Sequence, residues 1–224
     1  MIPFSDVHEG AAIARLTADR LLGTSNEQKG RSGADLRRAC GDMKTNADNF
    51  IVDNVIAQKL SDCFTQARLT GATGDEFTRI YRELADIAAV SLLAKLIRDA
   101  CVSFALQEAS TVLVDVKFTS RNDVERVRVE INTSFNQAEE VAADDMALVS
   151  YRALVSLHAA VIFYLSETAR PLPQMLNFEF ASARPTLVLS QRLYDTAAKA
   201  DELRKENKVV HPAFGPRSGR ALAF

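Results

Sequence analysis

The sequence predicts a mainly α-helical protein, in which an antiparallel helical bundle is followed by a small C-terminal strand-helix-helix-strand module. Three observations support this. Of 224 residues, 47% are apolar and 25% charged, which is ordinary for a globular protein, and nine glycines and six prolines are few for a β-sandwich or barrel. Apolar residues recur at helical spacing over 34–170. Residues 177–224 instead combine short alternating runs with two short helical patterns.

The N-terminal region, residues 1–32, is predicted to be a helix followed by a flexible linker. Residues 7–22 place apolar side chains on one helical face, and Gly23 ends that pattern. The stretch Gly23–Gly33 has no large apolar residue, which is typical of a linker. We therefore expect the first helix to be loosely attached, or to pack on a partner.

The predicted bundle, residues 33–172, consists of amphipathic helices with short connections, which place successive helices antiparallel. The helix over 88–108 is apolar nearly all round and should be the most buried. The run Ser110–Phe118 fits a strand and fits a continued helix nearly as well. The expected helices are, in order, 34–45, 47–69, one capped by Thr73 or Asp75, 88–108, one capped by Ser120 with Asp123, and a last one stopped by Pro171.

The C-terminal module, residues 173–224, should begin with a strand over Leu176–Phe180. Ser182 is the expected N-cap of its first helix. The second helix should start at Asp195-Thr196 and end at Asn207 in the left-handed conformation. A final apolar run leads to the C-terminus. Because so small a unit is marginal alone, we expect it to lean on the rest of the chain.

No residue pattern indicates catalysis, a cofactor or a metal. The three cysteines are isolated, so neither a disulfide framework nor a zinc site is expected. The histidines are far apart, and the acidic cluster at 139–145 lacks the spacing of a calcium loop. Phosphate-binding and nucleophile motifs are missing from the sequence. The residues concerned are Cys40, Cys63, Cys101, His8, His158, His211, Glu139, Glu140, Asp144 and Asp145.

Charge and hydropathy limit which partners and which cellular location the sequence predicts. The net charge of −2 gives no global signature for nucleic acid or membrane binding. The segment Glu179–Arg220 is locally basic, with eight Lys/Arg against five Asp/Glu. The N-terminus lacks a secretion signal pattern, and no membrane span is expected. We expect residence in the cytoplasm, or assembly there before action elsewhere.

The C-terminal third contains the run ETARPLPQMLNFEFASARPTLVLSQRLYDTAAKADELRKENKVVHPAFGPRSGRAL. This run, with GADLRRACGDMKTNADNF and FTSRNDVERVRVEINTSFNQAEEVAADDM upstream, resembles the DNA circularisation (DNA circulation) proteins of Mu-like phages and prophages. The resemblance covers Gly33–Phe224. It implies a gene among tail and baseplate genes and, because members usually have a further N-terminal domain, a chain that is a piece of a longer protein.

The order of elements in the module is similar to that of a lysin motif. In that fold an Asn ends the second helix, as Asn207 would, and a turn like Ser218–Leu222 leads into the last strand. The first-helix cap departs from the lysin-motif pattern, since Ser182–Leu187 replaces its Gly-Asp-Thr-Leu. This departure favours a protein neighbour over a glycan, as in the lysin-motif-like clamps of contractile-tail baseplates.

The resemblance implies a structural component of a Mu-like contractile tail or baseplate, which acts as a protein-protein clamp or adaptor in the virion and is not an enzyme. Other tail proteins and further copies in a homo-oligomeric ring are the implied partners. One alternative is a DNA-binding protein for phage DNA circularisation, and another is peptidoglycan binding. Apolar anchors, including Phe224, with a basic rim would form the interface, although the anchors fit the module's own core equally well. The candidate interface residues are Tyr194, Arg204, Asn207, His211, Phe214, Arg217 and Arg220.

Overall fold

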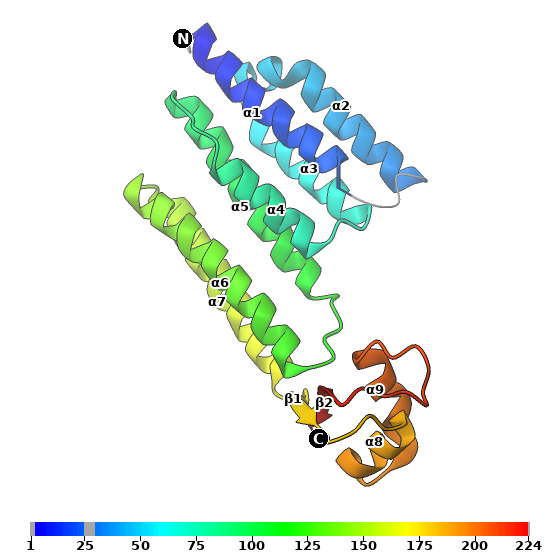
Figure 1. The fold of residues 1–224 in the computed structure, drawn as a ribbon. Coiled ribbons are helices and arrows are strands. Elements are labelled where there is room, and N and C mark those ends of the chain that lie inside the picture. Colours follow the sequence, from blue (N-terminus) through cyan, green and yellow to red (C-terminus); the bar gives the residue numbers. More distant parts are fainter. Residues whose placement is uncertain (1–2, 25–29, 224) are drawn as a thin grey trace. The chain divides into compact units, whose positions relative to one another are not determined.

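The computed structural model describes residues 3–24 and 30–223, and 71% of these residues are helical. In this part of the chain, nine α-helices precede or flank a single two-stranded antiparallel sheet (Figure 1). The prediction of a mainly α-helical protein with a small C-terminal sheet is confirmed. The helices are α1 Phe4–Leu22, α2 Arg31–Val52, α3 Ile56–Leu69, α4 Gly74–Ala85, α5 Leu92–Leu113, α6 Arg121–Asp144, α7 Leu148–Ala169, α8 Thr186–Tyr194 and α9 Ala200–Glu206; the strands are β1 Gln174–Glu179 and β2 Ser218–Ala223.

The chain forms two compact units. The first unit contains residues up to 116 together with 130–162, and the second contains 117–129 together with the chain from 163 onward. This division differs from the expected segments 1–32, 33–172 and 173–224. One reason is that the start of α6 bonds to the chain around β1: the amide of Arg121 donates to the carbonyl of Pro173 (2.9 Å), and the amide of Met175 donates to Asn122 (2.8 Å).

Helix α1 is part of the core of the first unit, against α2 and α5 (Figure 1). Its buried face combines small residues with Val7, Ile13 and Leu21, and Gly10 lies so close to α5 that a Cβ there would meet Ile97 Cδ1 at 2.7 Å. The carboxylate of Glu9 accepts the amides of Val90 and Ser91 (2.7 and 2.9 Å) just before α5 begins. The expectation of a loosely attached first helix is therefore wrong. The linker residues 25–29 lie outside the described residues.

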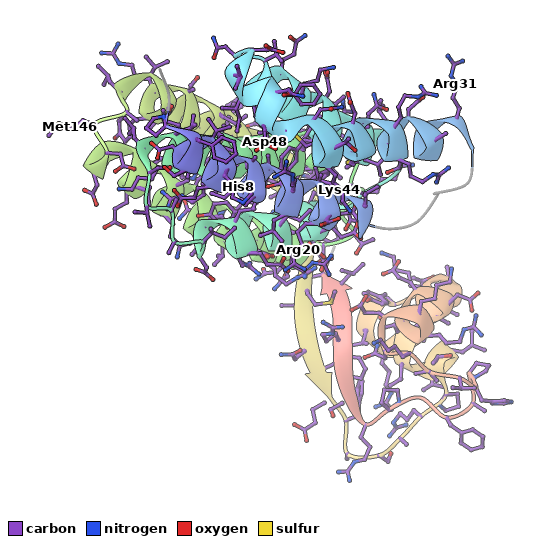
Figure 2. All side chains as sticks on the ribbon, turned by 90° about the horizontal axis from the view of Figure 1, so that it is seen from above. His8, Arg20, Arg31, Lys44, Asp48 and Met146 are labelled. Atoms are coloured by element: carbon purple, nitrogen blue, oxygen red, sulfur yellow. The ribbon has the colours of Figure 1, made fainter. Side chains whose placement is uncertain are left out.

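Ion pairs along α1 add to this packing. Arg20 pairs with Glu83 at 2.8 Å, and Lys44 of α2 pairs with Asp19 at 2.6 Å (Figure 2). Asp48 of α2 also pairs with an α1 side chain, that of Arg15. These side chains are roughly half-exposed, so each pair adds little to stability.

The predicted helices over 34–45 and 47–69 are wrong in their boundaries. The structure has α2 continuing to Val52, and the break follows at Asn54, whose φ is 56°. The backbone amide of Asn54 donates to the carbonyl of Ile51 (3.1 Å), and the backbone amide of Val55 donates to the carbonyl of Phe50 (2.9 Å). These are the two bonds of a Schellman motif. Asn tolerates the left-handed conformation, which is why the helix ends there.

Helices α4 and α5 follow the expected caps more closely. Thr73 forms a capping box with Glu76 at the start of α4, as expected for one of the two alternatives. Helix α5 continues to Leu113, so the run Ser110–Phe118 is helix and then turn, not a strand. The hydroxyl of Ser110 donates to the carbonyl of Leu106 (2.7 Å), a bond that suits a helical residue.

The core of the first unit contains large aromatic side chains and one charged pair. Phe64 packs against Phe77, with ring centroids 6.4 Å apart. The buried carboxylate of Glu108 accepts from Arg68 Nε at 2.6 Å. The Tyr81 hydroxyl is also buried and donates to the carbonyl of Ser134 in α6 at 2.9 Å. Burial raises the pKa of Tyr81, as expected for a phenol away from water.

Helices α6 and α7 complete the helical part. The hydroxyl of Ser120 accepts the amide of Asp123 at 3.2 Å, which confirms the predicted cap of α6. By length and composition alone, α7 is the one described helix that is apolar enough to cross a membrane. The sequence predicts no membrane span, because it has no run of 18 apolar residues. The same composition is found in helices that pack on protein, so this criterion alone does not define a span.

The second unit contains the strand-helix-helix-strand order. Strands β1 and β2 pair antiparallel, with Phe178 opposite Gly219. The core beneath them consists of Phe178 with Leu189, Leu203 and Ala221 from α8, α9 and β2. Alternation in β1 buries Phe178 and exposes its neighbours, which is why the sequence pattern identified this strand.

Three local predictions for the second unit are wrong. The N-cap of α8 is Pro185 and not Ser182. The residue after α9 that takes the left-handed conformation is Lys208 (φ 51°), while Asn207 has φ −95°. Strand β2 begins at Ser218, inside the stretch that was expected to be a turn. The second short helix does begin after a Thr196 cap, as a 3-10 turn that leads into α9.

Candidate functional site

The strongest candidate site is the loop of residues 208–217, which joins α9 to β2 and is called the 208–217 loop below. Its backbone is held at three points. The amide and the hydroxyl of Thr186 both donate to the carbonyl of Pro212 (2.8 and 3.2 Å). The amide of Phe180 donates to the carbonyl of Arg217 (2.7 Å), and Gly215 forms an isolated bridge with Arg184. The loop is therefore ordered by its own contacts before any partner binds.

Gly215 is required at its position because the loop approaches α8 closely. A Cβ there would overlap the carbonyl of Arg184 and would meet Leu189 Cδ1 at 2.7 Å. The residue is buried, so no side chain can turn outward to avoid these atoms. The close approach fixes where the neighbouring Phe214 emerges.

Two apolar side chains project from this anchored loop. Val210 is 94% exposed and Phe214 is 77% exposed. The ring of His211 lies beside Phe214, with centroids 5.4 Å apart, and its Nδ1 accepts the amide of Ala213 at 3.2 Å. An exposed aromatic side chain on an ordered loop can be buried by a partner at little cost in conformational entropy.

The basic residues at the two ends of the loop are exposed and have no ion pair among the residues that the structure describes: Lys208 and Arg217. Of these two, only Arg217 was a predicted interface residue, and the other two predicted basic residues differ from it. Arg204 pairs with Asp201 at 3.4 Å, and Arg220 pairs with Glu206 at 3.0 Å. Only part of the predicted basic rim therefore carries an uncompensated charge.

Asn207 is a structural residue of the module. Its Nδ2 donates to the carbonyls of Leu203 (2.9 Å) and Arg220 (2.8 Å), and its Oδ1 accepts the amide of Arg220 (2.8 Å). The side-chain amide thus pairs with both backbone groups of Arg220, as a neighbouring strand would. Gly219 leaves the room for this, since a Cβ there would overlap Asn207 Oδ1.

Tyr194 packs against the core of the second unit. It is half-buried against the cluster around Phe178, and Lys199 Nζ lies 5.1 Å from its ring centroid. Burial raises the pKa of Tyr194, and a hydrogen bond at the Leu222 backbone opposes that rise. Of the proposed apolar anchors, Phe214 is exposed, Tyr194 is a core residue, and Phe224 lies outside the described residues.

The structure therefore brings His211, Phe214 and Arg217 together on one loop, and places Tyr194, Asn207, Arg204 and Arg220 in the module's own framework. Sequence reasoning missed Val210 as an exposed apolar residue. The signal was its position directly before His211-Pro212, where neither a strand nor a helix continues to bury it.

Two of the residues considered for chemistry, Cys40 and Cys63, are hydrogen-bonded to each other. Cys40, Cys63 and Cys101 are buried free thiols. His158 packs on Phe135, with ring centroids 4.9 Å apart, and its Nδ1 contacts Glu139 at 2.9 Å. Within residues 3–24 and 30–223, no three His, Cys, Asp or Glu side chains are arranged to hold a metal ion. The 208–217 loop is the candidate contact site of the described surface.

No family model and no curated protein matches this sequence.

Proposed function

We propose that the chain is a structural component of a Mu-like contractile phage tail or baseplate, where it acts as a protein-protein clamp or adaptor during tail assembly. The observation that carries this proposal is the exposed Phe214 on the anchored 208–217 loop. The sequence resemblance over Gly33–Phe224 supplies the setting. The proposal places the protein in the virion tail, after assembly in the cytoplasm of the host bacterium.

The fold assignments that belong to this proposal are an antiparallel helical bundle and a lysin-motif-like module. The module assignment is supported by the order β1, α8, α9, β2 and by the Asn207 side chain, which joins the end of α9 to β2. Short connections between successive long helices support the bundle assignment. In this reading the helical part is a docking body and the module grips a neighbouring subunit.

The clamp role follows from how the loop presents its apolar groups. Full burial of a Phe side chain is worth about 1.5–3 kcal/mol relative to exposure, and most of that is unrealised for Phe214 in the free chain. Because the loop is already ordered by the bonds to Thr186 and Phe180, little of this gain is lost to ordering on binding. Lys208 and Arg217 would steer an acidic partner surface to the same place.

The test is the location of the chain in purified tails. Tails from a phage that carries the wild-type gene should contain the chain by mass spectrometry, and electron cryomicroscopy should show density for it at the baseplate or at the end of the tail tube. A phage with Phe214→Ser should yield fewer complete tails, whereas one with Leu187→Ser, a change at another exposed apolar residue of the same unit, should assemble normally. Absence of the chain from purified tails would refute the proposal.

DNA binding is the second candidate, because Lys208 and Arg217 form no ion pair within the described residues. A gel-shift titration at several salt concentrations separates the two roles, since phosphate contacts make affinity fall steeply with salt. Binding at low salt that is lost in Lys208→Glu/Arg217→Glu would favour DNA. A pull-down with purified cell wall tests peptidoglycan binding: retention of the chain on the cell wall would favour that role, and a null result would leave the clamp role standing.

A further inference from the structure

The first unit contains a cavity of about 370 Å³ between α4, α5 and the facing segments of α6 and α7. This volume is in the range of about 300–1,000 Å³ that is typical of ligand pockets. The walls are largely apolar and the cavity opens to solvent at the surface. The apolar residues that line it include Leu96, Val102, Ala138, Val141, Ala142 and Leu154.

The charges at this cavity are acidic on balance. Arg98 is neutralised by Asp99, with Nη2 and Oδ1 2.8 Å apart, and also donates to the carbonyl of Ile87 (3.3 Å). Asp86 lines the cavity, is exposed, and forms no ion pair among the residues that the structure describes. A negative charge is thus left at the opening.

The turn between α6 and α7 adds to this charge. Asp144 and Asp145 lie between the lining residues Ala142 and Ala147, and both are exposed and outside any ion pair of the described part. Met146 follows them, is 89% exposed, and projects outward at one end of the first unit (Figure 2). The cavity therefore has an apolar interior, an acidic edge and an exposed apolar side chain beside it.

The 208–217 loop has the complementary properties. It projects Val210 and Phe214 from an ordered backbone, it has Lys208 and Arg217 at its ends, and it contains no acidic residue. The projecting aromatic side chain is complementary to an apolar cavity, and the two cations beside it are complementary to an acidic edge. Both halves of this contact are present on every copy of the chain.

We infer that the cavity of the first unit receives the 208–217 loop of a second copy of this chain, with Phe214 inside and Lys208 and Arg217 facing Asp144 and Asp145. The inference rests on the proposed clamp function and names its partner. Such a contact joins two different surfaces, so it is heterologous. Copies would add head to tail and form a closed ring where the rotation between them permits closure.

Sedimentation velocity over about 1–100 μM chain, a range suited to micromolar contacts, tests this. The wild-type chain should sediment faster as concentration rises. It should do so much less at about 0.5 M salt, where the Debye length falls to about 4 Å. Phe214→Ser should weaken the association about tenfold or more, as for loss of a central aromatic anchor, while the matched Leu187→Ser should not.

Charge exchange identifies the two surfaces. A chain with Lys208→Glu/Arg217→Glu has an acidic loop and an acidic cavity edge, and a chain with Asp144→Lys/Asp145→Lys has both basic. Each alone should remain monomeric, because like charges oppose each other. An equimolar mixture should associate again, because each loop then meets a cavity edge of opposite charge. A purely structural role of these four exposed residues would not produce this recovery.

Two results would overturn the inference: a wild-type chain that stays monomeric at all concentrations, or a mixture of the two charge variants that fails to associate while the wild type does. Circular dichroism of each variant establishes that it is folded. Failure here is distinct from failure of the proposed function. A chain that associates but is missing from purified tails would refute the tail role alone, and a monomeric chain present in tails would refute this inference alone.

Discussion

Replacing Asn207 by Ala should loosen the contact between α9 and β2 in the second unit. The substitution removes three hydrogen bonds, two from Nδ2 and one to Oδ1, with lengths of 2.8–2.9 Å. A hydrogen bond contributes about 0.5–1.5 kcal/mol net, so the three are worth about 1.5–4.5 kcal/mol. Because Asn207 is only half-buried, water replaces part of this, and we expect a loss of about 2 kcal/mol.

Hydrogen exchange reports this loss directly at the Arg220 amide, which donates to Asn207 Oδ1 in the wild type. A loss of about 2 kcal/mol raises the local opening constant roughly 30-fold, and the exchange rate of Arg220 should rise by that factor. The amides of Ala221 and Leu222 should follow if β2 opens as a unit. Exchange in α1–α5 should not change, since those helices belong to the first unit.

Asn177→Ala is the matched control for this experiment. Asn177 lies opposite Arg220 in the sheet and is exposed, so the same chemical change there removes no bond of the kind that Asn207 makes. Its exchange profile should equal that of the wild type. If Asn207→Ala leaves the exchange of Arg220 within about twofold of the wild type, the three bonds do not hold β2 and the reasoning is refuted.

Three further changes act elsewhere. Glu108→Gln should lower the free energy of unfolding by about 1–3 kcal/mol in urea titrations, because it leaves Arg68 without its buried carboxylate, and an unchanged midpoint would contradict this. Gly219→Ala should lower the free energy of unfolding of the second unit by about 1–3 kcal/mol, since the added methyl overlaps Asn207. Equal melting temperatures of the variant and the wild type would disprove this. Burial raises the pKa of Cys101 from 9.0 to about 12, so the folded state holds this proton more tightly. The free energy of unfolding should therefore fall as pH rises from 9 toward 12, and it should fall less in Cys101→Ala than in the wild type. The same pH dependence in both proteins would count against a raised pKa for Cys101.

The sequence was informative where local chemistry decides the structure. Thr73 and Ser120 each accept an amide three residues later, and a hydroxyl before an amphipathic run is a direct signal for this. Strand β1 was recognisable because alternation around Phe178 matches one buried and one exposed face. The order of the four elements in the C-terminal module followed from the same kind of pattern.

The errors arose where tertiary packing or helix termination decides. Asn54 and Lys208 both take the left-handed conformation after a helix, and neither is a glycine. Lysine is not a residue type that signals a left-handed helix end. Lys208 is held in this conformation by the two bonds of a Schellman motif: its amide donates to the carbonyl of Lys205 (3.1 Å), and the amide of Val209 donates to the carbonyl of Arg204 (2.9 Å). The role of Tyr194 was undecidable for a similar reason, since only the packing of α8 under β2 separates a core tyrosine from a surface anchor.

The cavity of the first unit could not be predicted from the sequence at all. Its lining residues come from four successive helices, α4 to α7, and small residues such as Ala138 and Ala142 contribute by the space they leave open. Periodicity assigns such residues to a buried face but does not say how closely the opposite helix approaches. The exposure of Phe214 was equally hidden, because it depends on the anchoring of Pro212 by Thr186.

The buried face of α1 has a consequence for how the protein tolerates sequence change. Gly10, Ala11, Ala14 and Ala18 are the residues that let this helix lie close to its neighbours. All four are buried, so a larger side chain would meet the side chains packed against it; at Gly10 even a Cβ would lie 2.7 Å from Ile97 Cδ1. A saturation library should therefore show an asymmetry at these positions, with size alone separating permitted from forbidden residues, whereas the outer face of the same helix should accept nearly any substitution except proline. At these buried positions of α1, the substitutions that accumulate during evolution are thereby limited by side-chain volume more than by side-chain polarity.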